Sequence, residues 1–180
     1  ALDLLLGMLR ANRVVELAEG KAALTARFIA ALRYRDLLEA KLEFAHLVAP
    51  DFLGLFTALL AEPERFFGEA KLFELFSYQR CFEATPENLA HSARWVRITT
   101  ALTKYESAAC LARHDFSRHR SMLDVGGNSG EFALRICRRH AAMRATVYDL
   151  PVVCAIGAQH VAGEAEAGRI DFVKADAAGG

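Results

Sequence analysis

The sequence of 180 residues carries no excess charge of either sign, because 22 lysines and arginines balance 22 aspartates and glutamates. A neutral chain has no general electrostatic attraction to nucleic acid or to an anionic membrane. The sequence also lacks an apolar run of about 18 residues, the length that a membrane-spanning helix needs. Its first residues lack the pattern of a secretory signal. We therefore expect neither a nucleic-acid partner nor a membrane partner.

Cysteine is scarce and is not arranged in pairs such as Cys-x-x-Cys; the four cysteines are Cys81, Cys110, Cys137 and Cys154. Each lies in an apolar, helix-like context, which favours buried free thiols in a reducing cytoplasm over disulfide bonds. The six histidines show no metal-ligand spacing. Of these, His114 and His119 are interpreted as polar surface groups. The sequence thus predicts a cytoplasmic protein without a metal site.

Hydrophobic residues make up 53% of the chain, which is ample for a core, and the length suits one or two domains. Helical apolar patterns dominate the first part of the sequence, and short apolar strands dominate the rest. We expect a helical domain over residues 1–114 and an α/β domain over residues 115–180.

The beginning of the chain predicts a helix over residues 2–10, strands over 14–17 and 21–24, and a further helix capped by Thr25. Helix, strand, turn and strand form the second half of a winged-helix unit. Winged helices can bind DNA, but this stretch has few basic residues, so a role in packing is favoured. The basic residues are Arg10, Arg13 and Lys21.

Three helices, the first of them the one capped by Thr25, are predicted from the spacing of apolar residues and from stop signals. The first covers residues 25–49 and ends at Pro50, the second covers 52–60 with Asp51 as its cap, and the third begins at Pro63. Phenylalanine is dense in this region. We interpret these rings as core, with one side of a flat substrate site or a partner interface as the alternative.

The stretch from Ser121 to Phe132 predicts a buried strand, a tight glycine turn and the start of a helix. Gly126, Gly127 and Gly130 allow the backbone to bend sharply and to approach a ligand without a Cβ in the way. Asn128 is one of the few other residues that tolerate a left-handed conformation. The first amides of the helix would point at a ligand in the loop.

Two more strands are predicted over residues 145–149 and 170–174, each with an acid at its carboxyl end. Asp149 lies 25 residues after Asp124, where the acid that binds a ribose is found in a βαβ unit. Right-handed crossovers bring the strand ends together, so Asp176 and the glycine turn are expected at the same crevice. An acid at such an edge is outside the core, so substitution of Asp149 is expected to affect binding more than folding.

These segments resemble the motifs of class I S-adenosylmethionine-dependent methyltransferases: Asp-x-Gly-x-Asn-x-Gly from Asp124, Tyr-Asp-Leu-Pro at Asp149, and the strand that leads to Asp176. The set is similar to that of O-methyltransferases acting on small phenols, hydroxyindoles and polyketides. The resemblance covers residues 85–180 well and residues 1–84 in outline. It implies an α/β fold, in which a helical N-terminal region with a winged-helix remnant precedes the first half of a Rossmann-like methyltransferase sheet.

The resemblance implies S-adenosylmethionine as cofactor. The glycines would lie against its methionine part, Asp149 would hold the ribose hydroxyls, and Asp176 would reach the adenine amino group. The full set is Asp124, Gly126, Gly127, Asn128, Gly130, Asp149, Leu150, Asp176 and Ala177. A helix predicted over residues 86–113 would line the substrate pocket with Trp95 and Thr99, where the family has phenylalanine and methionine.

The activity implied by the resemblance is methyl transfer to a hydroxyl of a small aromatic or polyketide-like metabolite by a homodimer. The sequence stops just past the third predicted strand, and we expect an incomplete chain that lacks the C-terminal catalytic half. No histidine matches the family's general base, so the catalytic residue stays unassigned. The histidines are His46, His91, His114, His119, His140 and His160.

Two other functions stay open. The first is a non-catalytic helical dimerisation protein with a vestigial nucleotide-binding fold. The second is a dinucleotide-dependent oxidoreductase, which Glu131 disfavours because it stands at the third glycine of that loop pattern.

Overall fold

The computed structural model describes residues 1–177, and contacts divide the chain into two compact units, residues 1–41 and 42–180. Unit 1 contains α1 (Leu2–Ala11), β1 (Val15–Ala18), β2 (Lys21–Leu24), α2 (Ala26–Ala31) and the 3₁₀ helix η1 (Leu32–Tyr34). The two strands pair antiparallel. Thr25 caps α2, since its hydroxyl oxygen accepts a hydrogen bond from Phe28 N at 3.1 Å. The expected order of helix, strand, turn and strand is confirmed, whereas its assignment to a winged helix stays a prediction.

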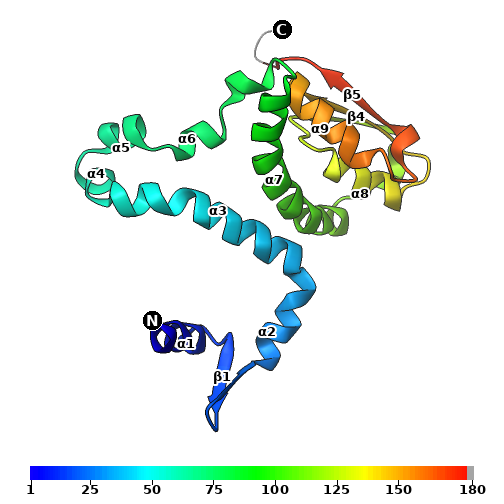
Figure 1. Ribbon diagram of the computed structural model, residues 1–180. Helices are drawn as coiled ribbons and strands as arrows, with labels where there is room; N and C mark the ends of the chain where they lie inside the picture. The colour runs from blue at the N-terminus through cyan, green and yellow to red at the C-terminus, as the bar shows by residue number, and fades with distance from the viewer. Residues whose placement is uncertain (178–180) are drawn as a thin grey trace. The chain divides into compact units, whose positions relative to one another are not determined.

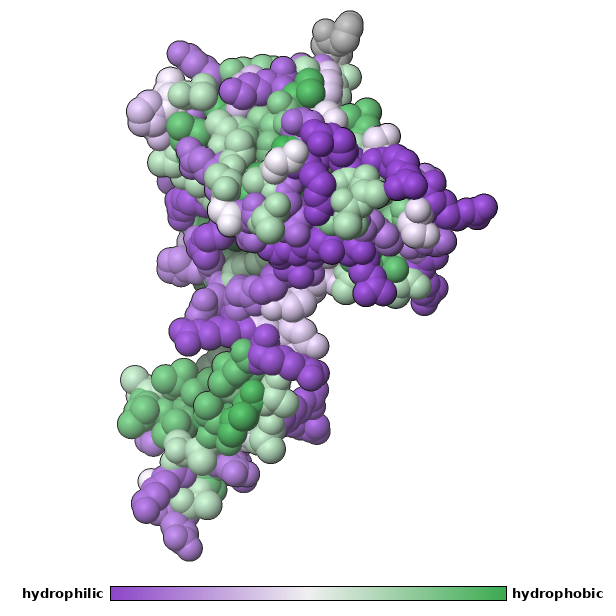
Figure 2. Space-filling view, turned by 90° about the vertical axis from the view of Figure 1, so that its right-hand side faces the viewer, coloured by the Kyte–Doolittle hydropathy of each residue, from purple (hydrophilic) through white to green (hydrophobic). Residues whose placement is uncertain are grey.

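Unit 1 buries little of its apolar surface. Figure 2 shows apolar side chains gathered on it, and Leu2, Leu4, Leu5 and Met8 of α1 are all exposed. No residue of α1 or α2 is buried.

The helices that follow differ from the prediction at Pro50. Helix α3 (Arg35–Gly54) is separate from α2 and contains Pro50, so the predicted end at this proline is wrong. A proline near the end of a helix removes one backbone donor, but the following residues can continue the helix. Asp51 is not a cap either: its buried carboxylate accepts a hydrogen bond from Leu72 N at 2.6 Å and so ties α3 to a later helix.

Short elements lead from α3 to the longest helix: α4 (Phe56–Ala61), α5 (Pro63–Glu69), α6 (Leu72–Leu75) and η2 (Tyr78–Cys81). Phe66 is buried, while Phe67 and Phe73 pack against it with much of their surface exposed, so the core interpretation holds only in part. Helix α7 (Pro86–Arg113) has the predicted bounds, and the Thr85 hydroxyl caps it by accepting from Asn88 N at 3.2 Å.

After η3 (Phe116–Arg118) the chain builds a parallel sheet, as the sequence predicts. Its elements are β3 (Ser121–Val125), α8 (Glu131–Arg139), β4 (Arg144–Asp149), α9 (Pro151–Val161), η4 (Ala167–Arg169) and β5 (Ile170–Lys174). The strand order is β3-β4-β5, with Leu123 beside Thr146 and Thr146 beside Asp171. Figure 1 shows α7 running beside the helices of this sheet. The carboxyl ends of all three strands therefore lie at one edge.

The two faces of the sheet are very different. Side chains of α8 and α9 pack on one face in a closed core, which includes Leu134, Ile136 and Val147. On the other face Leu123 and Val125 are 62% and 60% exposed. Parallel sheets are normally covered on both faces, so the core of this sheet is one-sided in residues 1–177.

Helices α4 to α7 and most of α3 belong to the same compact unit as the sheet. A second core joins Leu75, Cys81, Trp95 and Val96 to Val152 and Val153 of α9. An ion pair between Glu43 and Arg97 connects α3 to α7. The contacts thus divide the chain near residue 41, and a functional boundary at residue 114 stays a prediction.

All four cysteines are free, and Cys81, Cys137 and Cys154 are buried as expected. None of the helices described for residues 1–177 combines the length and the apolar character that crossing a membrane requires.

Candidate functional site

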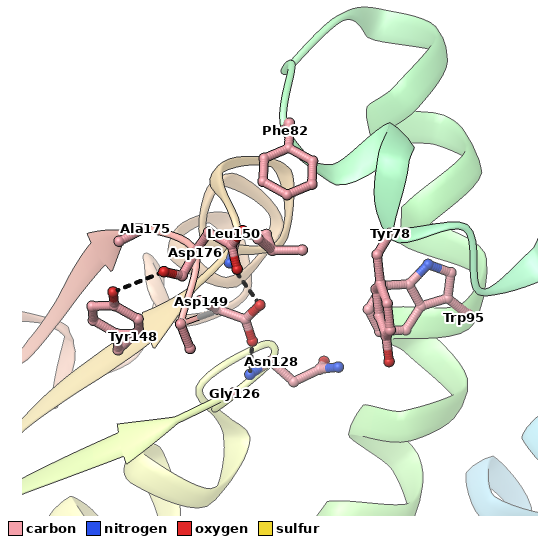
Figure 3. Close-up of a pocket in the computed structure, with 11 residues that line it drawn as sticks. Tyr78, Phe82, Trp95, Gly126, Asn128, Tyr148, Asp149, Leu150, Ala175 and Asp176 are labelled. Carbon is pink, nitrogen blue, oxygen red and sulfur yellow. Dashed lines mark hydrogen bonds between the residues drawn. The ribbon is translucent and has the colours of Figure 1, made fainter. Parts of the chain in front are cut away.

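A pocket of about 300 Å³ lies at the edge where the strands end (Figure 3). One side is formed by the loop after β3 and by the ends of β4 and β5. The facing side, here called the aromatic wall, consists of Tyr78, Phe82 and Trp95. The complete lining is Tyr78, Phe82, Trp95, Gly126, Asn128, Tyr148, Asp149, Leu150, Ala175, Asp176 and Ala177.

The loop after β3 has the tight backbone that its sequence predicts. Gly126, Asn128 and Gly130 all have positive φ angles, of 70°, 55° and 74°. Gly127 is needed for a different reason, because a Cβ there would lie 2.7 Å from Cγ of Asp124. The turn therefore brings the backbone close to the pocket, in a conformation that is unfavourable for residues with larger side chains.

Asp149 fastens this loop to β4. One carboxylate oxygen accepts a hydrogen bond from Asn128 N at 2.8 Å, and the other accepts from Leu150 N at 2.7 Å. A carboxylate has about four acceptor positions, so about two of them stay free for hydroxyl donors of a ligand. The residue is thus both a structural anchor of the loop and an acceptor that lines the pocket.

Asp124 lies behind the loop, and one of its oxygens is buried without a hydrogen-bond partner among the described residues. Burial, and secondarily the charge of Asp149, raise the pKa of Asp124 above its usual value. Two carboxylates that repel one another favour a ligand that brings positive charge or hydroxyl donors, and they disfavour a phosphate group.

Glu131 begins α8, and its side chain faces the neighbouring helices. It is 5% exposed and accepts hydrogen bonds from Arg135 Nε at 2.7 Å and His160 Nε2 at 2.8 Å. Burial alone would raise the pKa of Glu131, but the hydrogen bonds from His160 and Arg135 outweigh it and hold the pKa below its usual value. A paired carboxylate thus occupies the start of the helix, where a dinucleotide-binding loop has glycine.

The aromatic wall is built from two separate segments. Tyr78 lies edge-on to Trp95, with ring centroids 6.3 Å apart, and Phe76 supports Trp95 from the core at 6.1 Å. Figure 3 shows Tyr78 and Trp95 across the pocket from Asp149. Sequence reasoning missed Tyr78 and Phe82 because a 3₁₀ turn has no apolar period; the only signal was an aromatic cluster shortly before the Thr85 cap.

Seven of the residues predicted for the site line this pocket: Trp95, Gly126, Asn128, Asp149, Leu150, Asp176 and Ala177. Asp124, Gly127 and Gly130 shape the loop without lining the cavity. Thr99 is not part of the lining, because its hydroxyl bonds to Trp95 O and Val96 O within its own helix. Tyr148 was also missed; its hydroxyl donates to Asp176 O at 3.4 Å.

None of the histidines in the described part of the chain lines the pocket. His114 and His119 lie on the surface, with their Nε2 atoms 3.1 Å apart. Within residues 1–177, no group of three or more His, Cys, Asp or Glu side chains has an arrangement that holds a metal ion.

Comparison with known proteins identifies the family. A family model described as an O-methyltransferase domain matches residues 59–178, which is more than half of the chain. The chain belongs to the O-methyltransferase family. One relative, the 3-hydroxy-5-methyl-1-naphthoate 3-O-methyltransferase of Streptomyces sahachiroi, is 39% identical over 77 residues, which are 43% of this chain and 21% of the relative.

Solved structures of this family share the fold. Human N-acetylserotonin methyltransferase in complex with S-adenosylmethionine matches with a TM-score of 0.65 at 20% identity, over 97% of this chain and 50% of that protein. The O-methyltransferase NcsB1 from neocarzinostatin biosynthesis, bound to S-adenosyl-L-homocysteine and 1,4-dihydroxy-2-naphthoic acid, matches with a TM-score of 0.62 at 21% identity, over 97% and 53%. The chain therefore spans about half the length of these solved relatives.

Proposed function

We propose that this chain forms the cofactor-binding part of an S-adenosylmethionine-dependent O-methyltransferase whose acceptor is a hydroxyl on a small aromatic or polyketide-like metabolite. The observation that carries the proposal is the convergence of Asp149, the glycine loop and Asp176 on one pocket that faces an aromatic wall. The family membership of residues 59–178 supports it independently.

The chemistry of the pocket fits the cofactor. The free acceptor positions of Asp149 suit the two ribose hydroxyls, Leu150 offers an apolar contact to adenine, and Asp176 suits the adenine amino group. The acidic pair Asp124 and Asp149 favours a cationic ligand over a doubly charged pyrophosphate. Ala177 is small, so the contact on that side of adenine is weak. When bound, the cofactor supplies an electrophilic methyl group.

The aromatic wall suits a flat acceptor. Tyr78 and Trp95 present ring edges and faces to the pocket, and such surfaces favour stacking with aromatic ligands. Relatives of this chain act on or bind naphthoic acids, which are flat and hydroxylated. The contribution of the lining residues is to hold the acceptor hydroxyl in line with the methyl group, since catalysis of this reaction is largely positioning. The base that removes the hydroxyl proton is not assigned to any of them.

We also propose that the protein is a homodimer through residues 1–84. The exposed leucines and Met8 of α1 in unit 1, and separately exposed rings such as Phe67 in unit 2, are apolar surface that a second copy would cover. The same surface supports the alternative of a non-catalytic dimerisation protein, in which the pocket would bind no cofactor.

Titration calorimetry with S-adenosylmethionine, S-adenosylhomocysteine and NAD separates the candidates. We expect binding of the first two ligands and none of NAD. Asp124 and Asp149 disfavour a pyrophosphate, and Glu131 stands at the helix start where a dinucleotide-binding loop has glycine. Absence of binding for all three would favour the dimerisation protein. Binding of NAD alone would overturn the methyltransferase proposal in favour of a dinucleotide enzyme.

A further inference from the structure

We propose that Thr100 and Ser129 form a hydroxyl clamp that holds the glycine loop against α7 and thereby sets cofactor affinity. Neither residue lines the pocket, so both are positioning residues. The clamp itself follows from the geometry, whereas its effect on S-adenosylmethionine rests on the proposed function.

The clamp joins two segments that are 29 residues apart in sequence. The Thr100 hydroxyl lies 2.7 Å from the Ser129 hydroxyl and 2.6 Å from the Val96 carbonyl oxygen. A hydroxyl has one proton, and a carbonyl can only accept. The geometry has Thr100 Oγ1 as the donor in both contacts, to Val96 O and to Ser129 Oγ, so its one proton is shared between them.

The contact between the two hydroxyls is buried, so its loss is costly. Ser129 is 2% exposed, and its hydroxyl has no other hydrogen bond among the described residues. Loss of the Thr100 hydroxyl would leave the buried Ser129 hydroxyl without a hydrogen-bond partner, which costs more than the loss of an exposed hydrogen bond. The loop would then move toward another partner or toward solvent.

Hydrogen bonds continue from the clamp to the pocket. Ser129 N donates to the side-chain oxygen of Asn128 at 2.7 Å, and Asn128 N donates to Asp149 at 2.8 Å. Asn128 has a positive φ of 55°, a conformation that persists only where its surroundings hold it. A loose Ser129 therefore weakens the contact that orients the Asp149 carboxylate toward a ligand.

The other end of the clamp is on the helix that carries the aromatic wall. Val96 directly follows Trp95, and both are buried in the core between α7 and α9. The clamp thus fixes the loop on the cofactor side relative to the wall on the acceptor side. The clamp therefore positions both sides of the pocket.

Four variants test the clamp. Thr100→Val removes the hydroxyl at nearly constant shape, Ser129→Ala removes the other partner, and Thr100→Ser keeps the hydroxyl. The matched control is Ser107→Ala, which removes a buried hydroxyl of the same helix whose hydrogen bond among the described residues goes to Lys104 O at 3.1 Å.

The first measurement needs no ligand. Amide hydrogen exchange at Asn128 and Ser129 should be about fivefold faster in Thr100→Val and Ser129→Ala, as expected for one lost hydrogen bond. Exchange in Thr100→Ser and Ser107→Ala should match the parent chain. Equal exchange in all variants would overturn the clamp, and Ser129→Ala decides the matter if Thr100→Val does not fold.

The second measurement is affinity for S-adenosylmethionine, followed by the fluorescence of Trp95, the one tryptophan of the sequence. Thr100→Val and Ser129→Ala should each bind about fivefold more weakly. A fifth variant that combines Thr100→Val with Ser129→Ala should be no worse than either, because both changes remove the same interaction. If the affinity is unchanged while exchange is faster, the clamp holds the loop but does not set cofactor affinity, and the proposed function stands. A parent chain that binds no cofactor would count against the proposed function instead, with the exchange data still deciding the clamp.

Discussion

Unit 1 and the sheet of unit 2 both have regular secondary structure, but they differ in how they are stabilised. In unit 1 the first helix and both strands form where expected, the helix predicted over residues 25–49 is divided into α2, η1 and α3, and no side chain of α1 or α2 is buried. Around the sheet, Leu134 and Ile136 of α8, Met143 before β4 and Val147 of β4 are almost completely enclosed. Secondary structure thus follows from local pattern in both regions, whereas a closed core exists only in the second.

The difference has a consequence for function. Every residue of the pocket lies in unit 2, on elements that rest on the two buried cores. Unit 1 contributes apolar surface and no part of that lining. Stability and ligand binding should therefore respond to changes in the sheet, and association should respond to changes in unit 1.

The largest effect on stability should come from Arg169, which ends η4. Its guanidinium donates to three backbone carbonyls, those of Cys137 at 2.9 Å, Met143 at 3.0 Å and His140 at 3.1 Å. These carbonyls include the last ones of α8, which have no partner within the helix. Arg169→Ala should lower the free energy of unfolding by roughly 3 kcal/mol, because it removes three hydrogen bonds from a charged donor; His140 O keeps its bond from Met143 N.

Urea unfolding measures this effect. The control is Arg144→Ala, which removes an exposed ion pair with Asp171 at 3.6 Å and should cost at most about 0.5 kcal/mol. Similar unfolding midpoints for both variants would show that the sheet does not depend on this cap, and the contrast between the two regions would lose its main support.

Arg169 also shows where sequence reasoning ends. The strand bounds and the glycine loop were predicted because alternation, glycine and the spacing of acids are local signals. The role of Arg169 depends on three carbonyls from another segment, and no local pattern reports such a partner. The same holds for Asp51, whose partner Leu72 is 21 residues away, and for Tyr78, which reaches the pocket through tertiary packing.

The next largest effect should be on binding, at Asp149. Asp149→Ala should weaken binding of S-adenosylmethionine about ten- to a hundredfold, because hydrogen bonds to a charged acceptor are worth about 1.5–3 kcal/mol. The expectation that folding is spared needs revision, since the carboxylate also accepts from Asn128 N and Leu150 N. We expect an additional loss of about 1 kcal/mol in unfolding free energy.

Asp171→Ala is the matched control for Asp149→Ala. Asp171 lies on the exposed face of β5, and its only described partner is Arg144. Calorimetry should give the parent affinity for this variant and a much weaker one for Asp149→Ala. Equal affinities for Asp149→Ala and the parent chain would reject the ribose assignment.

The smallest effect on the sheet should come from unit 1, where the pair Leu4→Glu and Leu5→Glu places two charges on the exposed side of α1. If residues 1–84 mediate self-association, burying these carboxylates at an interface would be unfavourable, and sedimentation velocity should show a shift from dimer to monomer. The free energy of unfolding of unit 2 should change by less than about 0.5 kcal/mol, because neither leucine packs in its cores.

Arg118→Glu is the charge-matched control, since it changes the net charge by the same two units at an exposed residue outside 1–84 and should leave the dimer intact. A parent chain that sediments as a monomer at micromolar concentration, or a double variant that remains dimeric, would mean that the apolar surface of α1 is not what holds two copies together.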